Sequence, residues 1–124
     1  MTALAKVAPD AATVLTKAVV RASDALEINQ KVLARILGNS PSTVSRMVQG
    51  GALLRPNTGE WDAAAALIRV YRSLGGLLDG NDQLIKVWMT TFNHDLAATP
   101  VETLETGGGV YQLGAYLDAY RGRF

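Results

Sequence analysis

The sequence has 124 residues, with 48% apolar and 19% charged side chains; this composition excludes a disordered chain, and the net charge of +1 indicates no particular class of partner. It contains no cysteine, which excludes a disulfide framework and a thiolate metal site, and no apolar run approaches the roughly 20 residues of a membrane-spanning helix. We therefore expect a soluble, cytoplasmic, globular protein.

The first half of the chain shows helical periodicity and clear helix boundaries. Gly38 ends one apolar segment, and Ser40 is a good N-cap with Pro41 at the first helical position behind it. The pattern predicts three helices, near residues 9–24, 29–37 and 41–49.

The second half is also helical in its pattern. Gly75-Gly76 suggests a break within the long apolar segment, and Thr99 with Glu102 forms the sequence pattern of a capping box. The predicted helices lie near residues 60–78, 82–93, 99–105 and 110–121. In the helix at 82–93 we expect a buried side made of Leu84, Ile85, Trp88 and Phe92. No strand pattern or repeat is visible, so the predicted fold class is all-α.

Charge is distributed unevenly along the chain. Residues 1–56 hold seven basic and three acidic side chains (7 − 3 = +4), and residues 57–124 hold five basic and eight acidic ones (5 − 8 = −3). A basic half followed by an acidic half indicates two different tasks, although so few charges also permit a chance distribution.

Residues 29–50 have the properties that a helix-turn-helix requires. Ala34 is small enough for a close helix crossing, and Gly38 tolerates the positive φ of a tight turn. The apolar residues that we expect between the two helices are Val32, Leu33, Leu37, Val44 and Val48. The second helix turns polar residues outward, namely Ser42, Thr43, Ser45, Arg46 and Gln49. The alternative is simply two packed helices joined by a glycine turn.

This segment resembles the phage-repressor and Xre type of helix-turn-helix, in the order and spacing of Gln30, Ala34, Gly38, Val44 and Gly50. The resemblance implies that the second helix enters the DNA major groove, with bases read by Ser42, Thr43, Ser45 and Arg46. Arg46 would contact guanine, and Gln30 a phosphate, as would Lys31, Arg35 or Arg55. Ser40 and Gln49 complete the predicted DNA-binding set. Because this helix carries few cations, we expect a homodimer or a higher assembly on operator DNA, such as a larger toxin–antitoxin complex.

Residues 87–122 resemble the toxin-binding region of Xre/MbcA/ParS antitoxins, through Trp88, Asn93, Thr99-Pro100, Leu104, Thr106, Gly108 or Gly109, and Gly122. Antitoxins of this family neutralise RES-domain toxins, which consume NAD or use it to modify a target. The resemblance implies that the C-terminal region covers the toxin's active site. The expected toxin-binding residues are Tyr120, Arg121, Arg123 and Phe124, although a solvated terminus is the alternative for them.

The resemblance divides the chain into three parts: a helix-turn-helix region at 1–56, a connecting helix at 57–78 and a helical toxin-binding region at 79–124. No cofactor or catalytic function is expected, because the single histidine, His94, cannot form a zinc site and no nucleophile has an evident partner. Trp61, Trp88 and Phe92 are expected in the core. Two rival functions stay open: a plain repressor whose C-terminal half dimerises, and a protein-interaction module without DNA affinity.

Overall fold

The computed structural model describes residues 10–122, which form an all-helical fold as the sequence predicts. Its helices are α2 (Ala11–Ala25), α3 (Gln30–Leu37), α4 (Pro41–Val48), α5 (Gly59–Leu77), α6 (Asp82–Thr90), α7 (Pro100–Leu104) and α8 (Gly109–Arg121). Within the described range, the only β-type pairing is an isolated bridge between Asn93 and Ala98. No helix in this range is long and apolar enough to cross a membrane.

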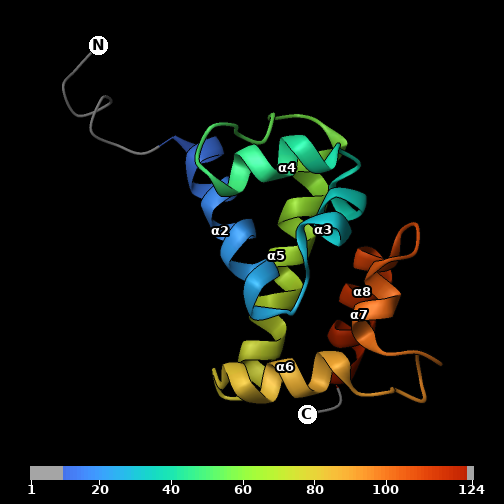
Figure 1. The fold of residues 1–124 in the computed structure, drawn as a ribbon. Helices are drawn as coiled ribbons and strands as arrows, with labels where there is room; N and C mark the ends of the chain where they lie inside the picture. The colour runs from blue at the N-terminus through green and yellow to red at the C-terminus, as the bar shows by residue number, and fades with distance from the viewer. Residues whose placement is uncertain (1–9, 123–124) are drawn as a thin grey trace.

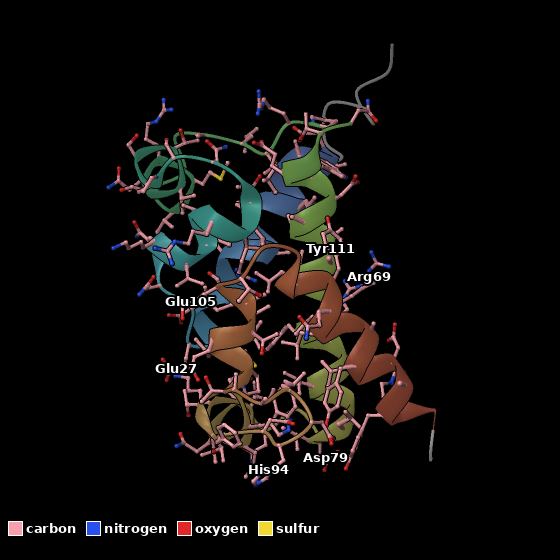
Figure 2. The ribbon with its side chains drawn as sticks, turned by 90° about the vertical axis from the view of Figure 1, so that its right-hand side faces the viewer. Glu27, Arg69, Asp79, His94, Glu105 and Tyr111 are labelled. Carbon is pink, nitrogen blue, oxygen red and sulfur yellow. The ribbon has the colours of Figure 1, made fainter. Side chains whose placement is uncertain are left out.

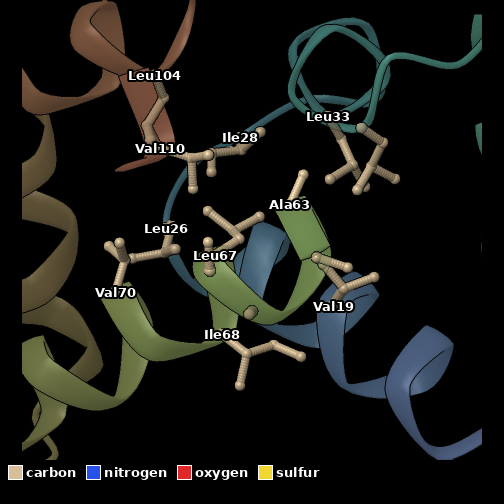
Figure 3. Close-up of a cluster of buried hydrophobic side chains, with 14 of the residues drawn as sticks. Val19, Leu26, Ile28, Leu33, Ala63, Leu67, Ile68, Val70, Leu104 and Val110 are labelled. Atoms are coloured by element: carbon tan, nitrogen blue, oxygen red, sulfur yellow. The ribbon is translucent and has the colours of Figure 1, made fainter. Parts of the chain in front are cut away.

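The long helix α5 is the central element. It packs against α2 and α3 along its first part and against α8 along its second, while α6 crosses its far end (Figure 1). Figure 3 shows α5 residues Leu67 and Val70 meeting Leu26 from the end of α2 and Val110 from α8. The buried apolar residues form one continuous cluster that extends from Val19 to Leu117. The first and last described helices therefore share a core, so the position of α8 is tied to that of α3 and α4.

Short polar residues determine where most helices begin. Ser40 accepts a hydrogen bond from the Thr43 N–H at 3.1 Å, with Pro41 in the first turn as predicted. The predicted capping box is also present: Thr99 accepts from the Glu102 N–H at 3.1 Å and its own N–H donates to the Glu102 carboxylate at 2.9 Å. These bonds satisfy N–H groups that have no partner within the helix.

The long helix predicted near 60–78 is confirmed, but the extra break suggested at Gly75-Gly76 is absent. α5 continues through both glycines to Leu77, because its apolar face is packed against α8 and tertiary packing outweighs the low helix propensity of glycine. The chain turns only afterwards, where Asp79 (φ 58°) and Gly80 (φ 68°) adopt the left-handed conformation.

The expected buried side of α6 is also partly wrong. Leu84 is 48% exposed and Phe92 55% exposed, while the buried contacts come from Ile85 and Met89. α6 ends early, at Thr90, and the Thr90 and Thr91 hydroxyls donate to carbonyls of the preceding turn. Phe92 therefore lies beyond the helix and outside the core. Trp61 and Trp88 are half-buried against the core, closer to the prediction.

The approach of α7 to α8 depends on a glycine. A Cβ atom on Gly109 would lie 1.8 Å from the carbonyl oxygen of Thr103, so no side chain fits there without a backbone shift. Gly108, just before it, has φ 74° and forms the start of α8 without a side-chain cap. The glycine run thus brings α7 and α8 into close contact.

Candidate DNA-binding and partner-binding sites

The α3–turn–α4 unit has the geometry of a helix-turn-helix. Gly38 adopts the left-handed conformation at φ 69°, and the Asn39 N–H donates to the Ala34 carbonyl at 2.9 Å, which closes the turn. Ala34 is 2% exposed, as expected for a close helix crossing. One core prediction is wrong: Val48 is 42% exposed, and Met47, at 4% exposed, takes the buried position instead.

The predicted base-reading residues lie together on the outer side of α4. Ser42, Arg46 and Gln49 are exposed at helical spacing, and Thr43 and Ser45 are half-buried beside them. α4 contains no acidic residue. This exposed stripe is therefore polar and carries one positive charge, on Arg46, which suits contact with base edges and phosphates.

Hydrogen bonds organise the first turn of α4. The Ser40 hydroxyl donates to Thr43 Oγ1 at 2.8 Å and lies 3.2 Å from the Ser42 hydroxyl. The Arg46 guanidinium donates to Thr43 Oγ1 at 3.5 Å, so its positive charge is held over the N-terminal turn of the helix. In helix-turn-helix proteins, the N-terminal end of the second helix is the end that reads bases.

The residues expected to contact phosphates differ in their surroundings. Gln30 and Lys31 are exposed in the first turn of α3, which Asn29 caps. Arg35 lies 3.9 Å from Glu105, and Arg55 forms a salt bridge with Glu60 at 3.1 Å. Among the described residues, Lys31 and Arg46 form no salt bridge, which leaves these two as the better candidates for phosphate and base contacts.

Glu60 is a site residue that sequence reasoning missed. Its side chain is 3% exposed, and it accepts hydrogen bonds from the Asn39 amide at 2.8 Å and from the Arg55 backbone N–H at 2.9 Å. Burial alone raises the pKa of Glu60, but the bonds and charge of Arg55, together with the Asn39 bond, outweigh it and hold the pKa below its usual value. The Glu60 carboxylate on α5 is thus bonded both to Asn39 in the turn of the helix-turn-helix and to Arg55 in the segment between α4 and α5.

The predicted toxin-binding residues lie at the end of the described chain. Tyr120 is 37% exposed, with its ring 6.2 Å from that of Tyr116. The Arg121 guanidinium donates to the Ser73 hydroxyl of α5 at 3.3 Å, so in this structure it lies against the helix. The other two predicted residues, Arg123 and Phe124, lie outside the described residues.

An apolar cleft opens beside Tyr120, and the sequence pattern did not reveal it. It has a volume of about 430 Å³ and is lined by Leu74, Leu77, Leu78, Trp88, Tyr116 and Tyr120. The loop beside it is ordered by hydrogen bonds: the Tyr116 hydroxyl donates to Asp95 at 2.8 Å, and Asn93 Oδ1 accepts from the Asp95 N–H at 2.9 Å. His94 in this loop is exposed, and its ring meets that of Phe92 edge-on, with centroids 5.1 Å apart.

Comparison with known protein families assigns both parts of the chain. Residues 5–75 match the model of the antitoxin Xre-like helix-turn-helix domain, and residues 73–123 match that of the antitoxin Xre/MbcA/ParS C-terminal toxin-binding domain. No match was found among curated proteins. The α4 stripe falls within the first match, and all residues that line the cleft fall within the second.

Proposed function

The chain belongs to the Xre-like helix-turn-helix antitoxin family and is an antitoxin with a toxin-binding C-terminal region; from this premise we propose that its toxin is a RES-domain, NAD-consuming enzyme and that the antitoxin represses its own operon. In this proposal it acts in the cytoplasm by binding and not by catalysis. The observation that carries the repressor function is the exposed α4 stripe, with Arg46 held over its N-terminal turn.

The proposal gives each α4 residue a role on operator DNA. Ser42, Thr43 and Ser45 contact base edges or nearby phosphates, and Arg46 contacts guanine with two N–H groups. Gln30 contacts a phosphate from α3, and the remaining predicted contacts come from Ser40 and Gln49. These contacts fix the register of the protein on the duplex.

We further propose that two copies bind the operator together. α4 carries a single cation, Arg46, and DNA affinity depends strongly on the number of phosphates neutralised. Two recognition helices about 34 Å apart reach successive turns of the major groove. A homodimer therefore supports the affinity that one copy lacks, and it leaves the C-terminal region of each copy available for toxin.

In the proposed complex, the region at 79–124 covers the active site of the toxin. Tyr120, Arg121, Arg123 and Phe124 make the contacts there, since guanidinium groups suit a pocket that binds a charged dinucleotide. The connecting helix at 57–78 joins this region to the helix-turn-helix region at 1–56. Arg121 would have to leave Ser73 to take part, at the cost of one part-buried hydrogen bond.

The test is co-expression of the antitoxin with the protein encoded beside it, followed by size-exclusion chromatography with light scattering. We expect a stable complex, and we expect the partner to deplete NAD once it is separated from the antitoxin. Deleting residues 121–124 should weaken inhibition, whereas Arg46→Ala should leave inhibition intact and lower operator affinity. A chain that retains no partner but binds its upstream DNA would favour a stand-alone repressor instead.

A further inference from the structure

The apolar cleft at the end of α5 is built by residues of three helices, α5, α6 and α8. The last turn of α5 contributes Leu74, Leu77 and Leu78, α6 contributes Trp88, and α8 contributes Tyr116 and Tyr120. Trp88 is half-buried and Tyr120 is 37% exposed, so aromatic surface faces solvent in a concave site. We call this site the foot cleft. Concave sites with aliphatic and aromatic walls typically receive one large apolar side chain of a partner.

The rim of the foot cleft is acidic. Asp79 directly follows Leu78, and the carboxylate of Asp95 is bonded to the Tyr116 hydroxyl at 2.8 Å. Arg121, which follows Tyr120, is directed to Ser73 on α5, to which its guanidinium donates a hydrogen bond. Asp79 and Asp95 thus place negative charge beside the cleft, which favours a basic partner surface.

We propose that the foot cleft receives an apolar anchor side chain of the toxin, flanked there by lysine or arginine. This inference rests on the proposed function and adds an anchoring site next to the C-terminal tail, with which it shares Tyr120. Two observations select the toxin as occupant. All six lining residues lie within residues 73–123, the part of the chain matched to the toxin-binding domain, and the acidic rim complements a basic partner. A second copy meeting this cleft face to face would place two acidic rims together.

A matched pair of tyrosine variants tests the cleft. Tyr111 and Tyr120 are nine residues apart in α8, which places them on opposite sides of the helix. Tyr111 lies in the upper part of α8, far from Asp79 at the lower end of α5 (Figure 2). The probe is the protein encoded beside the antitoxin, purified as an inactive variant. We expect Tyr120→Ala to weaken binding about tenfold or more, and Tyr111→Ala by less than about threefold.

A charge variant keeps the test valid if Tyr120→Ala disturbs folding. The double variant Asp79→Asn with Asp95→Asn leaves the apolar walls intact; asparagine tolerates the positive φ at residue 79 and retains an acceptor for Tyr116. We expect slower association with the same probe and a smaller effect of added salt on the association rate. Asp118→Asn, on α8 outside the cleft, removes the same type of charge and should change neither quantity.

The outcomes separate the two proposals. If the unaltered antitoxin captures no neighbouring-gene product, the proposed function itself fails. If it captures the product but Tyr120→Ala and the double aspartate variant bind as tightly as their controls, the foot cleft is not the anchoring site and the proposed function stands. If Tyr120→Ala changes the mass of the antitoxin alone in light scattering, the cleft holds a second copy, and the inference is overturned.

Discussion

Replacing Glu60 with alanine is expected to destabilise the fold and loosen the helix-turn-helix from α5. The buried carboxylate accepts hydrogen bonds from the Asn39 amide and the Arg55 backbone N–H, at 2.8 and 2.9 Å. Hydrogen bonds to a charged group contribute about 1.5–3 kcal/mol each. The lower end applies here because Asn39 is half-buried and Arg55 exposed. The two bonds together give about 3 kcal/mol, and the solvated Arg55 guanidinium adds little.

Glu60→Gln separates shape from charge. The glutamine amide keeps one acceptor oxygen but turns an N–H₂ group toward the second donor. We therefore expect it to lower the free energy of unfolding by about half as much as alanine does. The measurement is urea unfolding at pH 7, with the free energy of unfolding obtained by linear extrapolation. Asp62→Asn is the control, since Asp62 is an exposed carboxylate in the same first turn of α5. It reports the effect of losing a negative charge near the helix N-terminus.

The pH dependence gives a second test of the same reasoning. The pKa of Glu60 in the folded state lies below its usual value of 4.5, so the folded state favours the ionised carboxylate. The stabilising contribution is therefore complete above about pH 4.5 and is lost as the pH falls through the folded-state pKa. The difference in unfolding free energy between the native chain and Glu60→Gln should shrink over that range. A difference that stays constant from pH 7 to pH 3, or a cost below about 1 kcal/mol for Glu60→Ala, would refute the assigned role.

Three further substitutions test other parts of the structure. Gly109→Ala should lower the free energy of unfolding by about 1–3 kcal/mol, since its Cβ would overlap the Thr103 carbonyl; an unchanged urea midpoint would contradict that close approach. Gly76→Ala should raise the stability by about 0.5–1 kcal/mol in the same assay, because this exposed helical position has open space around it; a loss of stability would argue for a break in α5. Arg46→Ala should lower operator affinity roughly ten- to hundredfold by fluorescence anisotropy at fixed salt, and unchanged affinity would remove Arg46 from the base-reading set.

Features that depend on neighbouring residues were predictable from the sequence. The N-cap at Ser40, the capping box at Thr99 and the left-handed Gly38 are each decided within about five residues of chain. Apolar spacing likewise predicted the helices and the outward direction of Arg46 on α4. Both the all-α fold and the resemblance to a helix-turn-helix follow from such local signals.

Features that depend on which elements meet were decided only by the tertiary structure. The Glu60 carboxylate accepts a hydrogen bond from Asn39, which lies 21 residues earlier in the chain. No local sequence pattern predicts that a charged residue in the first turn of a helix is buried. Leu84 and Phe92 belong to an apolar pattern, yet α6 crosses the end of α5 and buries only the side that carries Ile85 and Met89. The foot cleft likewise exists because α5, α6 and α8 converge there. Apolar periodicity indicates that one face of a helix is apolar. Only the packing of neighbouring elements determines how much of that face is buried.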